Sequence, residues 1–391
     1  MLHNTPLIFV FLLSIETAVL WAAGHPRSKK FFRFIPAVFW IYFLPMVASS
    51  FNMIDRQSPL YGWTTAYGLP ASLFLLLVGV DLQAIARLGR TAVLIFLAGS
   101  VGIMAGTVIA FALFRPLTGD HFFSGFGALS ASWIGGSANM IAVKEAVGTP
   151  DHVFLPMVVV DTVVPYAWMG FLIFASTWQR PIDRWNRADE ALLEHIRRRL
   201  VTYSLDRQKQ RIDVIKTVLI TLAAFIVSLG LKQVSSALPV VLGVISAFTW
   251  TVILVSVFGL ACSLTRLRQF EPEGSTKVGY FLLYFVLTTI GAKASITHLG
   301  ESLILIAAGF MIVLVHAAVL MAAARYFKAP VMLAAAASQA NIGGVASAPV
   351  VAEVYQTGLS TIGLLMAVLG NIIGTYLGII VSQVCRAITL M

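Results

Sequence analysis

Apolar segments long enough to cross a lipid bilayer recur along the whole chain of 391 residues. A helix of roughly 17–25 apolar residues spans about 30 Å of hydrocarbon. We expect such segments at about 6–24, 33–50, 66–82, 91–114, 123–146, 152–176, 215–232, 238–264, 277–292, 302–325, 330–355 and 359–385. The sequence therefore predicts an all-α polytopic membrane protein with about 11–13 transmembrane helices.

The low charge content excludes a water-soluble protein. Only 11% of the residues are charged and 59% are hydrophobic, whereas soluble domains carry about 25% charged residues. The net charge is +10, but the basic residues lie in loops between apolar segments and form no stripe interleaved with aromatic residues. This pattern is typical of the cytoplasmic loops of a membrane protein. We therefore expect the lipid bilayer as a partner, and no nucleic acid.

One long polar stretch, at about 177–214, divides the chain near its middle. Apolar residues recur at helical spacing between 192 and 200, beside three consecutive arginines. This spacing predicts an amphipathic helix on the membrane surface, and a solvated linker is an equally good interpretation. Residues 1–176 and 215–391 are then the two halves of the protein.

An internal repeat relates these two halves. A shift of 208 residues places 128–145 on 336–353 with eight identities in eighteen positions and no gap. Each matching segment lies within one long apolar run, at about 123–146 in the first half and 330–355 in the second. We therefore expect two homologous repeats, and the same unusual helix in each.

Each of these helices contains a glycine pair, Gly135–Gly136 in the first and Gly343–Gly344 in the second. Each glycine costs roughly 1 kcal/mol relative to alanine in a helix and lets the backbone leave helical geometry. Unwound backbone survives in a membrane only where protein or a watery cavity surrounds it. Close helix packing would explain the glycines but not the polar side chains gathered around them. Paired broken helices instead predict the binding site of a secondary transporter.

The polar groups around the glycine pairs suit an ion and an anionic solute. Side-chain oxygens are suitable ligands for a hard monovalent cation. The expected ion-binding residues are Ser130, Ser132, Asn139, Asp161, Gln339, Asn341 and Ser347, with Asn139, Asn341 and Asp161 as the main Na⁺ candidates. The N-termini of half-helices attract negative charge. The expected solute-binding residues are Gly135, Gly136, Ser137, Gly343, Gly344 and Asn371.

Acidic residues at membrane depth are functional by default, because their burial is costly. Asp161 lies in the middle of an apolar run, where it would be a cation ligand or proton carrier unless it pairs with a helix-terminal amide or with Thr162. Glu145 and Glu353 coincide under the shift and either bind an ion or face water at a helix end. Glu16 has no counterpart in the repeat, so we expect it to snorkel or to be structurally paired.

Three motifs resemble the DUF819 (YjcL-like) family of bacterial membrane proteins, over nearly the whole chain: WIGGSAN at 133–139, SQANIGGV at 338–345 and LGNIIGTYLG at 369–378. That family is grouped with the cation:proton antiporter and bile-acid:sodium symporter superfamily. The resemblance implies inverted repeats, a scaffold domain, and a core domain with two crossed broken helices. It also implies a homodimer in the bacterial inner (plasma) membrane that moves by an elevator-type mechanism coupled to Na⁺ or H⁺.

These arguments predict a sodium-coupled symporter of a small anionic organic solute, such as a carboxylate or a dipeptide of cell-wall origin. Antiporters of the superfamily resemble each other in a pair of adjacent aspartates, whereas here Asp161 is followed by Thr162. A sodium/proton antiporter that uses Asp161 is the alternative, and a channel also stays open. We expect no enzyme and no cofactor beyond the coupling ion, because HExxH and GxSxG motifs are absent from the sequence.

Overall fold

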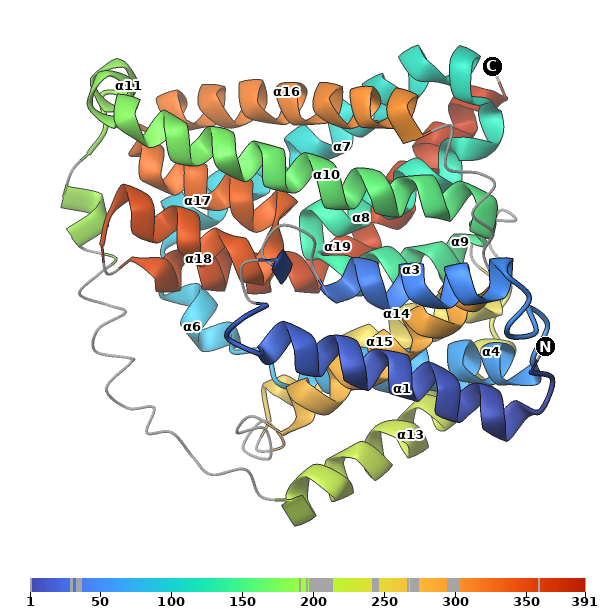
Figure 1. Cartoon of the computed structure of the whole chain (residues 1–391). Coiled ribbons are helices and arrows are strands. Elements are labelled where there is room, and N and C mark those ends of the chain that lie inside the picture. Colours follow the sequence, from blue (N-terminus) through green and yellow to red (C-terminus); the bar gives the residue numbers. More distant parts are fainter. Residues whose placement is uncertain are drawn as a thin grey trace. The chain divides into compact units, whose positions relative to one another are not determined.

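The computed structural model describes residues 2–28, 31–32, 37–189, 191–194, 196, 214–240, 246–265, 267, 274–293, 302–357 and 359–390. Within these ranges the chain is helical, without a strand beyond one isolated bridge between Leu2 and Ile54 (Figure 1). Every predicted apolar segment contains a helix or a series of helices among its described residues. The all-helical prediction is therefore confirmed.

Several of these helices have the length and composition of membrane spans. Among the described residues, six helical stretches are long and apolar enough to cross a bilayer. They are α1 (Thr5–Gly24), α7 (Arg90–Thr118), α10 with α11 (Asp151–Asn186), α13 (Val214–Ser236), α16 (Ser302–Tyr326) and α19 (Ser360–Thr389). Shorter apolar helices are α3 (Ala37–Ser50), α14 (Ala247–Ser263) and α17 (Val331–Ile342). The outer faces of the long helices are apolar too. On α13, for example, Val214 and Ile226 are 69% and 68% exposed. Such surfaces suit lipid rather than water.

The chain forms two compact units, and each unit draws on both halves of the sequence. Unit 1 contains Met1–Val80, Lys144–Thr162 and Arg211–Ser302. Unit 2 contains Asp81–Val143, Val163–Gln210 and Leu303–Met391. The units therefore do not follow the order of the chain, and both glycine pairs belong to unit 2.

Unit 1 is built from α1, α3, α4 (Pro59–Trp63), α5 (Leu69–Val78), α13, α14 and α15 (Ser275–Lys293), with the π-helical turn η1 (Thr64–Gly68) between α4 and α5. Close helix contacts occur at glycines. A Cβ atom on Gly291 of α15 would lie 2.2 Å from the carbonyl oxygen of Tyr42 on α3. A Cβ atom on Gly259 of α14 would lie 3.2 Å from the Leu77 side chain. Small residues let membrane helices approach in this way.

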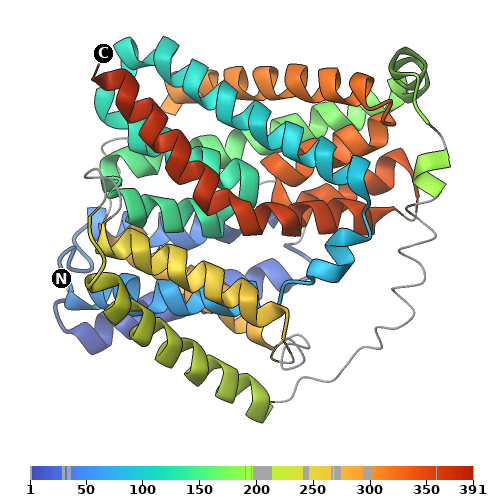
Figure 2. The ribbon, with the colours of Figure 1, turned by 180° about the vertical axis from the view of Figure 1, so that it is seen from behind.

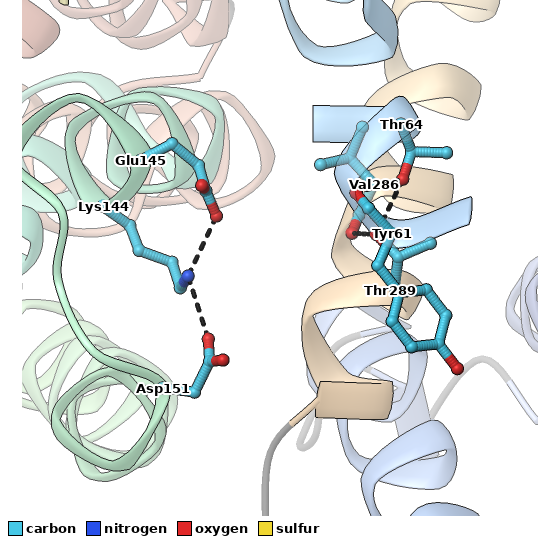
Figure 3. A network of polar contacts seen from close by, with 7 residues as sticks. All are labelled: Tyr61, Thr64, Lys144, Glu145, Asp151, Val286 and Thr289. Atoms are coloured by element: carbon cyan, nitrogen blue, oxygen red, sulfur yellow. Dashed lines mark hydrogen bonds and ion pairs between the residues drawn. The ribbon is translucent and has the colours of Figure 1, made fainter. Parts of the chain in front are cut away.

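A buried hydroxyl pair joins two segments of unit 1 that are distant in sequence. The Thr64 hydroxyl donates to Thr289 Oγ1 at 3.1 Å, and the Thr289 hydroxyl lies 2.7 Å from the carbonyl oxygen of Val286 (Figure 3). Thr64 Oγ1 also lies 3.0 Å from the carbonyl oxygen of Tyr61. These polar groups are thus satisfied inside the protein, as a lipid environment requires.

Unit 2 holds α7, α8 (Phe123–Gly135), α16, α17, α18 (Gly344–Tyr355) and α19, with the short helices α6 (Leu82–Ala86) and η2 (Asp120–Phe122). It also holds the first part of α9 (Ser137–Val147) and the second part of α10 (Asp151–Ala175). Figure 2 shows α19, in red, beside α7, in cyan, with which it is in contact.

A row of small residues brings α19 against α8. Gly370, Gly374 and Gly378 recur every fourth residue on α19 and so share one face. A Cβ atom on Gly374 would lie 2.8 Å from the Cα atom of Gly135, and one on Gly378 would lie 2.4 Å from the Cβ atom of Ala131. The motif that carries the family resemblance is therefore also the contact surface of the first broken helix.

The described part of the polar stretch at 177–214 is attached to unit 2. Helix α11 (Gln179–Asn186) supplies Asp183, whose Oδ1 accepts a hydrogen bond from the Val331 amide at 2.7 Å, at the start of α17. Leu193 and Ile196, from the predicted amphipathic helix, are buried. Arg180, which belongs to this stretch, is one of the residues that line a cavity of about 780 Å³. Residues 195 and 197–200 of the predicted helix lie outside the described residues.

Candidate functional site

Both glycine pairs interrupt a helix at the expected place. Helix α8 ends at Gly135 and α9 begins at Ser137, and the residue between them, Gly136, has φ +81°. Helix α17 ends at Ile342 and α18 begins at Gly344, which has φ +65°. In each pair it is the second glycine that adopts the left-handed region, which other residues rarely tolerate. The sequence pattern therefore marks the points at which the two helices are interrupted.

The first interruption is fixed by Asn139. Its Oδ1 accepts hydrogen bonds from the Thr375 amide at 2.9 Å and from the Thr375 hydroxyl at 2.5 Å. Its Nδ2 donates to the carbonyl oxygen of Gly135, and to that of Asn371 at 3.4 Å. An amide oxygen has two lone pairs, and Thr375 occupies both. In this conformation Asn139 holds the break against α19 and has no free lone pair for a cation.

The second interruption is closed by a hydrogen bond that spans it. Gln339 of α17 donates from Nε2 to Ser347 Oγ of α18 at 2.8 Å. A Cβ atom on Gly343 would lie only 2.0 Å from that Nε2 and 2.1 Å from that Oγ. The absence of a side chain at this glycine therefore makes room for the bond. Ser347 and Asn139 occupy corresponding positions under the 208-residue shift.

Asn341 ties α17 to α7. Its Oδ1 accepts from the Ser100 hydroxyl at 2.9 Å, and its Nδ2 donates to the carbonyl oxygens of Ala337 at 3.2 Å and Phe96 at 3.4 Å. Its side chain is completely buried. One lone pair of Oδ1 is left over, so Asn341 can still offer an oxygen to an ion. The sequence gives no periodic signal for Ser100, which lies inside a long apolar helix.

A buried hydrogen-bond chain runs through Ser338. The carbonyl oxygen of Gly99 can only accept, so His316 Nδ1 at 2.8 Å carries the proton. His316 Nε2 then accepts from the Ser338 hydroxyl at 2.9 Å, and Ser338 Oγ accepts from Trp168 Nε1 at 2.8 Å. The chain fixes one tautomer of a neutral histidine. The only clue in the sequence is that His316, alone among the histidines, lies within an apolar run.

Three polar atoms close to the interruptions have no partner among the described residues. They are Ser130 Oγ and Trp133 Nε1 of α8 and Gln339 Oε1 of α17. All three residues are at most 1% exposed. Buried polar atoms normally form hydrogen bonds, so each exception calls for an explanation such as water or a ligand. The atoms comprise a hydroxyl, an N–H donor and an amide acceptor, a set that can contact both a cation and an anion.

The other predicted residues have varied surroundings. The carbonyl oxygen of Ser132 accepts from the Gly136 amide at 2.6 Å. Ser137 and Asn371 are half-buried. Asp161 is half-buried as well, but it belongs to unit 1, whereas all the other predicted ion-binding and solute-binding residues belong to unit 2. The predicted residues are thus distributed over both units, with Asp161 in unit 1 and the others in unit 2.

Glu145 forms part of an ion-pair cluster in unit 1. Lys144 is 4% exposed at its side chain, and its Nζ lies 2.9 Å from Glu145 Oε1 and 2.9 Å from Asp151 Oδ1 (Figure 3). Phe154 places its ring 5.5 Å from the same Nζ. Charges of opposite sign thus compensate one another at the turn between α9 and α10. Glu145 is accordingly an ion-pair partner of a buried lysine.

The helices, the apolar outer surfaces and the two interrupted segments together define a polytopic membrane protein. The family described as "Protein of unknown function (DUF819)" matches residues 10–388. The chain belongs to this DUF819 family. It is also 26% identical over 381 residues to the "Uncharacterized membrane protein YjcL" of Bacillus subtilis (strain 168), covering 92% of this chain and 94% of that protein.

Proposed function

We propose that this protein is a secondary active transporter, and that unit 2 carries its binding site. The main support is the pairing of two helix interruptions with buried polar atoms that have no partner in the described part of the chain. Both interruptions have a glycine with positive φ, and Ser130 and Gln339 supply unpartnered oxygens beside them. Interrupted helices in corresponding positions of two halves are typical of transporter binding sites.

The coupling ion in this proposal is Na⁺. Oxygens from a hydroxyl and from amides are suitable ligands for such a cation. The residues with spare acceptor capacity are Ser130, Gln339 and Asn341, while Asn139 holds the first break in position. The transported solute is a small organic anion, which the Trp133 N–H and the N-termini of α9 and α18 attract. In this proposal, unit 2 carries the bound ion and solute across the membrane by an elevator-type movement.

Thermal unfolding of the detergent-purified protein at constant ionic strength tests the ion. A ligand that binds only the folded state raises the unfolding temperature by mass action. We expect Na⁺ to raise it relative to K⁺ or choline, and Ser130→Ala to lose most of that rise. Ser72→Ala is the matched control, because Ser72 is equally buried but its hydroxyl donates to the carbonyl oxygen of Leu69.

Two results would count against this assignment. An equal Na⁺ effect in wild type and in Ser130→Ala would remove Ser130 from the site. The absence of any cation preference across a range of pH would remove Na⁺ altogether. Proton exchange through Asp161 would then be the alternative, and it would be measured as a pH-driven flux that Asp161→Asn abolishes.

A further inference from the structure

Helix α1 carries a single acidic residue, Glu16, within an apolar stretch that is long enough to span a membrane. Glu16 lies on the buried face of α1 with Ile8, Leu12 and Val19, which recur at helical spacing. It is 0% exposed. A carboxyl group therefore lies on the same buried face of α1 as three apolar side chains.

Neither oxygen of the Glu16 carboxyl has a hydrogen-bond partner among the described residues. The expectation that Glu16 snorkels is therefore wrong, and no structural partner for it occurs among the described residues. Snorkelling would place the carboxyl at the surface, and a structural pair would place a donor or a cation beside it. A negative charge buried in this way, without a partner among the described residues, would cost several kcal/mol.

The described helices with the closest contacts to α1 supply no partner for the Glu16 carboxyl. These are α3, α4 and α15. Helices α3 and α4 contain no acidic or basic residue, and their only titratable groups are Tyr42 and Tyr61. The Tyr61 hydroxyl donates to the Asp55 carbonyl oxygen at 2.5 Å, and the Tyr42 hydroxyl has no partner in the part of the chain that the structure describes.

Helix α15 places its charged residues only at its two ends, Lys277 near the start and Lys293 as the last residue. Between these two lysines, the titratable groups of α15 are Tyr280 and Tyr284. The centroids of their rings lie 5.9 Å apart. None of these groups hydrogen-bonds to the Glu16 carboxyl. Since no described residue hydrogen-bonds or ion-pairs with the Glu16 carboxyl, the state that fits this environment is the neutral acid.

We propose that Glu16 is a proton-binding site of unit 1. Its carboxyl carries a proton in the conformation described here and releases it only when water or a cation reaches the buried face of α1. The ligand is the proton itself. An acid at membrane depth without a countercharge is typical of groups that bind and release protons during a functional cycle. Glu16 belongs to unit 1, whereas the proposed ion and solute residues discussed above belong to unit 2, and the proposal for Glu16 does not depend on the proposed transport.

Infrared spectroscopy of the purified full-length protein at neutral pH tests the proton directly, because a protonated carboxyl and a carboxylate have distinct carbonyl bands. We expect a protonated-carboxyl band in the wild type that disappears in Glu16→Gln. Glu145→Gln is the matched control, since the Glu145 carboxyl lies 2.9 Å from Lys144 Nζ, whereas the Glu16 carboxyl has no such partner among the described residues. That variant should keep the band. A wild-type spectrum without the band, or a band that persists in Glu16→Gln, would overturn the proposal.

Thermal unfolding as a function of pH provides a second readout that a folding defect cannot imitate. The folded state holds a proton that the unfolded state releases, so the unfolding temperature of the wild type should fall as pH rises. Glu16→Gln and Glu16→Leu should remove part of this fall, and Glu16→Leu should fold at neutral pH. If both variants fail to fold, or if the alkaline fall is unchanged in them, Glu16 is not a proton site.

Discussion

The amide oxygen of Asn139 accepts hydrogen bonds from both the backbone amide and the hydroxyl of Thr375, at 2.9 and 2.5 Å. Through this relationship the first interrupted helix is held by α19, which follows it by more than 200 residues in the sequence. The residue that the sequence suggests as an ion ligand is thus occupied by the protein itself. What Asn139 does in this conformation is fix the shape of the break.

Removal of the Thr375 hydroxyl should loosen this attachment. We expect Thr375→Val to lower the free energy of unfolding by about 0.5–1.5 kcal/mol, the usual net contribution of one hydrogen bond, and to weaken the Na⁺ response. Thr375→Ser is the control, because it keeps the hydroxyl. Thermal unfolding with and without Na⁺ measures both effects. Equal behaviour of the two variants would show that the hydroxyl has no role.

The positive φ angles at Gly136 and Gly344 predict a penalty for any other residue there. Alanine in the left-handed region costs roughly 1–2 kcal/mol, so Gly136→Ala and Gly344→Ala should each destabilise the protein by about that amount. Gly170→Ala is the matched control, because this glycine of α10 has open space around it and no positive φ. Similar unfolding temperatures for all three variants would contradict the backbone geometry of the breaks.

The glycine pairs illustrate what the sequence could and could not predict. Two glycines in an apolar run, repeated at a fixed shift, are enough to locate an interruption, because helix propensity and backbone freedom are local properties. The division into units is not local. Lys144 and Val143 are neighbours in the chain but belong to different units, and no composition change marks that boundary.

The side-chain partners of the site were hidden from the sequence for a related reason. Ser100, His316 and Thr375 lie in long apolar helices, and only tertiary packing brings them to Asn341, Ser338 and Asn139. The repeat also suggests that corresponding residues of the two halves have similar contacts, but their hydrogen bonds differ. Ser130 and Ser338 coincide under the 208-residue shift, but Ser338 has two hydrogen-bond partners and Ser130 has none among the described residues.

The buried hydrogen-bond chain through Ser338 predicts that loss of the Ser338 hydroxyl will strongly lower the stability of the protein. Ser338→Ala would leave the Trp168 N–H and His316 Nε2 buried without a partner, at about 1–3 kcal/mol for each group. Ser382→Ala is the matched control, since Ser382 is fully buried in unit 2 and its hydroxyl has no partner among the described residues. We expect thermal unfolding to show a clear loss for Ser338→Ala and none for Ser382→Ala. Equal losses would mean that the chain contributes nothing specific.

A substitution at Gly343 should affect ion binding, because it would disturb the hydrogen bond between Gln339 and Ser347 that passes next to this glycine. The Cβ atom of Gly343→Ala would collide with Gln339 Nε2 and Ser347 Oγ, so the two side chains would have to separate. We expect this variant to lose most of the Na⁺-dependent rise in unfolding temperature. Gln339→Glu should instead retain an oxygen at the unpartnered position and keep a Na⁺ response. An unchanged response in Gly343→Ala would show that this pair lies outside the ion site.

Lys144 provides a test of the ion-pair cluster in unit 1. Its side chain is 4% exposed, while those of Glu145 and Asp151 are 15% and 28% exposed. Removal of one partner of a buried ion pair leaves an uncompensated charge and typically costs about 3–5 kcal/mol. Lys144→Met should approach that range, because it leaves two carboxylates facing each other. Asp151→Asn should cost less, because Glu145 still neutralises the lysine and Asp151 is the most exposed of the three.

The triple variant Lys144→Met, Glu145→Gln, Asp151→Asn should recover much of the loss, since no charge is then left unpaired. Thermal unfolding of the three proteins measures this order, and a triple variant less stable than Lys144→Met alone would contradict it.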